Sequence, residues 1–176
     1  MISIKVKSRS VDLTDLASWF FIYSFFGWIY ETIYCSLTEG HYVNRGFLYG
    51  PIIPIYGSCI VFAIVLLYEK KINKIALFGI CAFIASAFEY VTSWWMELIF
   101  NRRWWDYSNE LFNINGRVCL GAALVFGLFG VLILCYFHPF LEKFLNECVP
   151  PRLTKALLKI FMPLFTIDLL ASIISA

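Results

Sequence analysis

The chain has 176 residues, of which 61% are hydrophobic and only 15% charged, with a formal net charge of +2. Soluble domains are nearer half apolar and a quarter charged, so this composition excludes an ordinary water-soluble globular protein. Several uncharged runs approach the ~20 residues that cross about 30 Å of hydrocarbon. Because the alternating segments of a membrane β-barrel are absent, the sequence predicts an all-α, polytopic membrane protein. The net charge gives no indication of nucleic-acid binding.

We expect about five transmembrane helices in a single integral membrane domain covering residues 1–176. Asp12 and Thr14 precede the first span, and either side chain can cap a helix N-terminus. Pro163 lies inside the last span and is expected to kink it. The predicted spans are residues 16–37, 46–68, 75–100, 118–137 and 153–176.

The second span is irregular in its first half, where glycine and proline are frequent. Proline lacks a backbone donor and disfavours helix in the residue before it. A regular helix is expected only from about Ile55 to Tyr68, which is ~21 Å and too short to cross the membrane. We therefore expect a broken or re-entrant segment at residues 46–57, whose backbone must be satisfied by protein or by a wet cavity. The helix-breaking residues are Gly46, Gly50, Pro51, Pro54 and Gly57.

The fourth span carries no charge and is rich in small residues. These would let a neighbouring helix approach closely. We expect His138-Pro139 to end this span and residues 140–152 to lie at the membrane interface. The small residues are Gly121, Ala123, Gly127 and Gly130.

The positive-inside rule predicts a cytoplasmic N-terminus. With that orientation, the outer loops contain only arginine as their basic residue, at Arg45, Arg102, Arg103 and Arg117. Arginine forms bidentate pairs and stacks on aromatic rings, so these four are predicted to be site residues rather than topology markers. The inner segments contain the other ten basic residues: Lys5, Lys7, Arg9, Lys70, Lys71, Lys74, Lys143, Arg152, Lys155 and Lys159.

Four acids fall inside the predicted spans, from the middle to the outer half: Glu31, Glu89, Glu97 and Asp168. Charges at this depth usually pair with one another or line water. The simplest arrangement is an outward-facing polar cavity where these acids meet the outer arginines. Tyr30 and Tyr90 lie beside two of the acids. Glu97 is nearer the interface, where an ordinary surface acid is the simpler interpretation.

The loop from Asn101 to Arg117, NRRWWDYSNELFNINGR, is unusually rich in charged and aromatic residues. Two interpretations are open. Trp104 and its neighbours form an aromatic belt at the interface, or Arg103 is held by Asp106, stacks on an indole and closes the cavity. In the second case we expect the loop to place its arginines over Glu31 and Glu89. For those two acids, a solute or proton path and a structural ion pair are both open.

A faint internal repeat relates the two hairpins, residues 16–68 and 75–137. Each has a glutamate, then an Asn-Arg pair 12 or 13 residues later, and then a glycine before the next span. In the predicted topology the two would be parallel repeats with a site between them, followed by a C-terminal helix. The six cysteines form no CxxC pair, so no disulfide framework or metal site is predicted. No cofactor is predicted.

The blocks YSFFGWIYETIY, NRGFLYGPIIPIYG, FEYVTSWWMELIF, RRWWDYS and FNINGRVCLGAALVFG resemble the CmpB-like family of ABC transporter type IV permeases. The resemblance covers about Trp19 to Gly130. It implies a small multi-pass protein of the bacterial inner membrane. It adds Asn44 and Asn113 to the candidate site. No Walker A motif occurs, so any ATPase would be another subunit.

Three functions are open. The first, and favoured, is a membrane-transport component, either permease-like or solute-binding. The second is an intramembrane enzyme acting on a lipid headgroup or lipid-linked substrate. The third is a membrane scaffold or regulatory protein whose charges only tie helices together. Since no nucleophile–base spacing occurs, an enzyme is less favoured.

Five helices are few for a translocation path, so the expected partners are membrane lipids and either further copies of the chain or another subunit, such as an ATPase. The complete set of candidate solute- or ion-binding residues is Glu31, Arg45, Glu89, Arg103, Asp106, Arg117, Tyr30, Tyr90, Trp104, Asn44, Asn113, Glu97 and Asp168.

Overall fold

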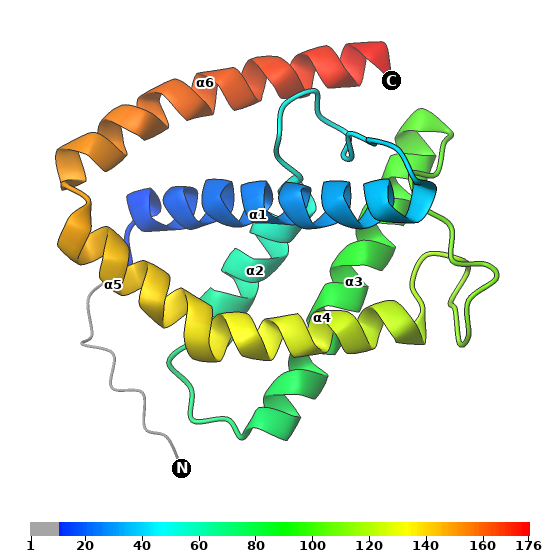
Figure 1. Ribbon diagram of the computed structural model, residues 1–176, viewed down its shortest axis with the longest axis horizontal. Coiled ribbons are helices and arrows are strands. Elements are labelled where there is room, and N and C mark those ends of the chain that lie inside the picture. The colour runs from blue at the N-terminus through cyan, green and yellow to red at the C-terminus, as the bar shows by residue number, and fades with distance from the viewer. Residues whose placement is uncertain (1–10) are drawn as a thin grey trace. The chain divides into compact units, whose positions relative to one another are not determined.

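The computed structural model describes residues 11–176, and it is entirely helical apart from its connections (Figure 1). Among these residues the only β pairing is an isolated bridge between Ile114 and Val118. The predicted all-α class is confirmed. Lys5, Lys7 and Arg9 lie outside the described residues. The helices are α1 (Leu13–Glu39), α2 (Pro54–Leu67), α3 (Lys74–Phe100), α4 (Leu120–Leu132), the π-helix η1 (Ile133–Phe137), α5 (His138–Cys148) and α6 (Pro151–Ser175).

Within residues 11–176, three helical stretches are long and apolar enough to cross a membrane: Lys74–Phe100, Leu120–Cys148 and Pro151–Ser175. The two other predicted spans coincide with α1, which has 27 residues, and with α2, an apolar helix of 14 residues. The protein is therefore a membrane protein by the length and composition of its helices. Its orientation stays a prediction.

The chain divides into two compact units, and the divisions fall inside α2 and inside α5. We call residues 62–144 the α3–α4 unit, and residues 11–61 with 145–176 the α1–α6 unit. Each unit contains one long irregular connection between two helices, residues 101–119 in the α3–α4 unit and residues 40–53 in the α1–α6 unit. The prediction of one integral domain, and that of two parallel repeats, stay predictions.

Short polar side chains set the helix ends. Asp12 and Asp15 form a reciprocal capping box at the start of α1, with N···O distances of 2.9 and 3.1 Å. Asn73 caps α3 by accepting from the Ala76 N–H at 2.8 Å. At its other end α3 stops at Asn101, which adopts the left-handed conformation. The Asn101 cap fixes where the connection that carries Arg103 and Arg117 begins.

Glycines bring α4 onto α3 in the α3–α4 unit. A Cβ on Gly127 would lie 2.9 Å from the Phe78 ring and 3.1 Å from Ala82 Cβ, and one on Gly130 would lie 2.7 Å from Cys81 Sγ. These separations leave no room for a methyl group, so the predicted close approach is confirmed at both positions. A Cβ on Gly121 would meet only Cys119 Sγ, at 4.0 Å, so that glycine is not needed for packing.

The prediction that His138-Pro139 ends the fourth span is wrong, because the helix continues through η1 and α5 to Cys148. In a regular α-helix the ring of Pro139 would collide with the carbonyl group four residues earlier. The π-helical turn before it widens the backbone there, and the His138 N–H donates to the carbonyl of Ile133, five residues back. The π-helical turn thus makes room for the proline within a helix that continues to Cys148.

In the α1–α6 unit, α1 and α6 run in the same direction and touch through aromatic rings (Figure 1). Phe21 contacts Phe161 and Phe165, with ring centroids 5.9 and 5.8 Å apart. α6 contains Pro163 and continues across it as one helix, and the kink expected there stays a prediction.

Residues 40–53, between α1 and α2, contain no helix, which confirms the predicted break and ends it at Pro54. The segment turns back along α1. Trp28 Nε1 donates to Asn44 Oδ1 at 2.8 Å, and the Ile53 N–H donates to the Ser24 carbonyl at 3.0 Å. Trp28 is about 16 Å along the axis from the end of α1 at Glu39. The irregular chain therefore runs beside the middle of a long helix rather than beyond its end.

Candidate functional site

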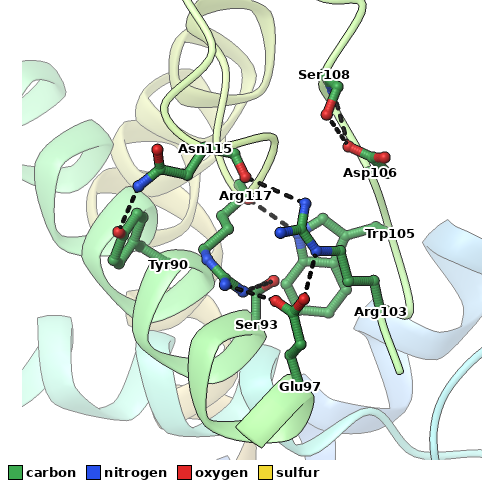
Figure 2. Close-up of polar contacts among 9 residues, drawn as sticks. All are labelled: Tyr90, Ser93, Glu97, Arg103, Trp105, Asp106, Ser108, Asn115 and Arg117. Atoms are coloured by element: carbon green, nitrogen blue, oxygen red, sulfur yellow. Dashed lines mark hydrogen bonds and ion pairs between the residues drawn. The ribbon is translucent and has the colours of Figure 1, made fainter. Parts of the chain in front are cut away.

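Two arginines of the 101–119 connection meet one carboxylate of α3 (Figure 2). Glu97 Oε1 lies 3.0 Å from Arg103 Nε, and Glu97 Oε2 lies 2.5 Å from Arg117 Nη2. The interpretation of Glu97 as an ordinary surface acid is wrong, because it is the residue on which both guanidinium groups converge. Such charge-assisted contacts are short and directional.

Arg117 is the most enclosed of the site cations, with 9% of its surface exposed. Its Nη1 donates to Ser93 Oγ at 3.1 Å, and its guanidinium carbon lies 5.8 Å from the centre of the Tyr90 ring. Its backbone carbonyl accepts from Trp105 Nε1 at 2.9 Å. Side chain and backbone are thus both fixed, which gives this cation one position relative to α3.

The connection itself is folded around Gly116. This residue has φ +67°, and a Cβ on it would lie 2.5 Å from Asp106 Oδ1 and from Ser108 Oγ. Asp106 accepts hydrogen bonds from the Ser108 N–H and hydroxyl, and these hold the pKa of the Asp106 carboxyl below its usual range. Arg103, which Asp106 holds in one of the two interpretations of the loop, forms its ion pair with Glu97.

Asn113, which was expected to belong to the site because of the family resemblance, supports the loop from inside. Its Nδ2 donates to the carbonyls of Ser108 and Glu110, at 3.1 and 2.9 Å, and its Oδ1 accepts from the Gly116 N–H at 3.1 Å. Its contacts are with loop backbone, so it shapes the connection that carries the arginines.

Glu89 is the buried acid of α3, with 8% of its surface exposed. The Tyr107 hydroxyl donates to its Oε1 at 3.2 Å. The hydroxyl of the next residue, Tyr90, accepts from Asn115 Nδ2 at 2.9 Å. Trp104 lies at the end of the helix and contacts the Phe100 ring. The face of α3 that carries Glu89, Ser93 and Glu97 is therefore covered by the loop.

The α1–α6 unit has a second, smaller cluster. The Tyr56 hydroxyl donates to Glu31 Oε1 at 2.8 Å, and Arg45 Nε lies 3.7 Å from Glu31 Oε2. Tyr30 contacts the rings of Tyr34 and Tyr56. In both units a glutamate of the helix before the connection thus accepts a hydrogen bond from a tyrosine that follows that helix.

Asp168 binds backbone. Its Oδ1 and Oδ2 accept from the N–H groups of Tyr49 and Gly50, at 3.0 and 2.9 Å, and Oδ1 also accepts from the Ser172 hydroxyl at 3.3 Å. A Cβ on Gly50 would lie 2.8 Å from Asp168 Oδ2. This carboxylate therefore satisfies the irregular segment, and glycine is needed where it does so.

Sequence reasoning missed several partners that the structure brings to the site. Ser93 lies on the helical stripe of Glu89 and Glu97, and that spacing was the available signal. Tyr56 and Tyr107 gave no signal of their own, because nothing in their neighbourhood in the sequence indicates which acid they meet. Among the described residues, no group of three His, Cys, Asp or Glu residues could hold a metal ion.

Comparison with known proteins identifies one family. Its sequence model, described as "Putative ABC-transporter type IV", matches residues 18–173. No curated protein and no solved structure matches the chain. The match covers both charged clusters and nearly all of the helices. The chain therefore belongs to the family described as "Putative ABC-transporter type IV".

Proposed function

We propose that the protein is a membrane-transport component, permease-like or solute-binding, whose polar site consists of carboxylates and arginines on its outer side. The observation that carries this proposal is the burial of an acid and a base where an apolar helix meets its connection. Glu89 of α3 is 8% exposed, and Arg117 of the 101–119 connection is 9% exposed. Membrane helices rarely retain such groups without a use for them.

Two further observations support the proposal. The irregular segment at 40–53 lies beside the middle of α1, and irregular backbone at such a depth is typical of segments that line a cavity. Glu31, beside this segment, is paired with Arg45 and accepts a hydrogen bond from the Tyr56 hydroxyl. These partners keep the acid in a polar environment, as expected along a solute or proton path. The family's name is also that of a transporter.

A second candidate is a scaffold or regulatory membrane protein. It is favoured by the saturation of Glu97, since both Arg103 and Arg117 already have that carboxylate as a partner. In a scaffold these contacts would serve only to tie the loop to α3. Replacing all three residues by apolar ones would then leave both the fold and the cellular phenotype intact.

A flux assay in proteoliposomes separates the transport component from the scaffold or regulatory protein. Pyranine inside the vesicles reports proton flux, and radiolabelled phosphate and rubidium report anion and cation flux. The test variant is Glu89→Gln, which keeps an oxygen for the Tyr107 hydroxyl but loses the charge. The matched control is Glu110→Gln, an exposed loop residue.

A transport component loses most of its flux in Glu89→Gln and keeps it in Glu110→Gln. If the protein, alone or with proteins that copurify with it, moves none of the three probes, the transport proposal fails. Equal flux in the parent and Glu89→Gln would remove this acid from the path.

A further inference from the structure

The connection between α3 and α4 displays three large apolar side chains at its tip. Leu111 and Phe112 are each 79% exposed, and Ile114 is 58% exposed. None of the three contributes to the charged cluster beneath the loop. We call Leu111, Phe112 and Ile114 the apolar tip.

The tip is held rigidly rather than left loose. The Leu111 carbonyl accepts from the Leu120 N–H at 3.3 Å, and Ile114 pairs with Val118 through its N–H at 2.9 Å. Asn113, between the tip residues, makes three hydrogen bonds to the loop backbone. A loop with this many internal bonds presents its side chains in one arrangement.

The backbone at the tip is also strained. Phe112 has φ +52°, in the left-handed region, and Asn115 follows at +54°. Asparagine tolerates this conformation, but for a bulky aromatic residue it is a clear outlier. Strain of this kind persists where it serves a function. Here its effect is to turn an aromatic ring outward.

The surroundings of the tip indicate what covers it. Trp94, Trp95 and Leu98, in the last turns of α3, are each more than half exposed, so this end of the helix has the aromatic and apolar surface of a lipid-facing interface. The Leu111–Leu120 hydrogen bond ties the tip to the first residue of α4. The tip is therefore joined directly to the start of a helix that is apolar and long enough to cross a membrane.

We propose that the apolar tip inserts into the phospholipid bilayer at its headgroup–acyl boundary and anchors the loop that carries Arg103 and Arg117. This anchoring does not depend on whether a solute is transported. Apolar side chains in such a boundary lie about 5–10 Å below the headgroups. A second copy of the chain or another protein is the competing occupant, and the test separates these from lipid.

The test places the photoreactive residue p-benzoylphenylalanine at 112 in the full chain, in its own membrane, with all native cysteines kept. Aromatic replaces aromatic, so the fold is disturbed little. The matched control carries it at Asn109, a polar exposed residue of the same loop. After illumination, mass spectrometry of the purified chain identifies the adduct.

The proposal expects a phospholipid adduct at 112 and none at 109. An adduct with a second copy, an adduct with another polypeptide, or no adduct at 112 would each overturn it. If the photoreactive chain does not fold, nitroxide labels at 112 and 109 in a cysteine-free chain give an independent answer in liposomes. Insertion predicts that the label at 112 collides more with oxygen, which dissolves in lipid, than with a water-soluble nickel chelate, and that the label at 109 shows the opposite preference. The same preference at both positions would refute insertion.

Discussion

Asp168→Ala tests whether one carboxylate holds the irregular segment in place. The substitution removes the acceptor for the N–H groups of Tyr49 and Gly50, which lie 3.0 and 2.9 Å from its two oxygens. A hydrogen bond to a charged group contributes about 1.5–3 kcal/mol to the free energy of unfolding, so these two hydrogen bonds together contribute about 3–6 kcal/mol. Because Tyr49 is exposed and water can replace part of the loss, we expect the free energy of unfolding to fall by about 3 kcal/mol, the low end of that range.

The assay is equilibrium unfolding in mixed micelles, in which a denaturing detergent is titrated against a mild one. Asp168→Asn keeps one carbonyl oxygen and should lose roughly half as much as Asp168→Ala. Ser172→Ala is the matched control, since it removes a weaker contact of 3.3 Å to the same carboxylate and leaves the backbone bonds intact. Amide hydrogen exchange gives a local readout, with protection lost at Tyr49 and Gly50 before other segments.

The reasoning would be refuted if Asp168→Ala unfolded within about 0.5 kcal/mol of the parent, the range of ordinary surface substitutions. Unchanged exchange at residues 49 and 50 would refute it independently, because it would mean that these N–H groups have another acceptor.

Two further outcomes are expected. Gly130→Ala should destabilise the protein by about 1–3 kcal/mol, because the added Cβ would lie 2.7 Å from Cys81 Sγ and overpack the helix contact. Gly79→Ala should stabilise the protein by up to about 1 kcal/mol, because a Cβ there has nothing within 4 Å and alanine favours a helix. Unfolding in detergent compares the two variants, and free-energy changes of the same sign would contradict the packing argument. The folded-state pKa of Asp106 lies below its ordinary 3.8, so its contribution to loop stability is present above that pH and is lost as pH falls through the lower value. Tryptophan fluorescence, followed from about pH 5 down to about pH 1, should show this loss in the parent and not in Asp106→Asn.

Local features of the fold were predictable because they depend on neighbouring residues. Glycine and proline in sequence predict the break before α2, since both act on the backbone of their own and the preceding residue. Asp12 caps α1 for a similarly local reason. Gly127 and Gly130 could be recognised because small residues repeat along one apolar helix.

Which acid pairs with which arginine could not be predicted from neighbouring residues in the sequence. Which acid meets Arg103 and Arg117 depends on the fold of a loop with left-handed backbone at Phe112 and Asn115, and nothing near Phe112 in the sequence signals that conformation. The role of Asp168 depends on contacts with Tyr49 and Gly50, which precede it in the sequence by 119 and 118 positions. Its acidic character alone was equally compatible with a solute site.

The π-helical turn before Pro139 has a consequence for how this chain can vary among its relatives. The hydrogen bond that closes this turn spans five residues instead of four, so the turn accommodates one residue more than an α-helical turn does. His138 is fully buried, with its ring centre 4.5 Å from that of Tyr68. A relative lacking one residue between 132 and 138 would regain a regular α-helix with its histidine facing nearly the same way, but its proline would collide with the preceding turn. Loss of a residue at this point should therefore occur together with a change at Pro139, while His138 can stay.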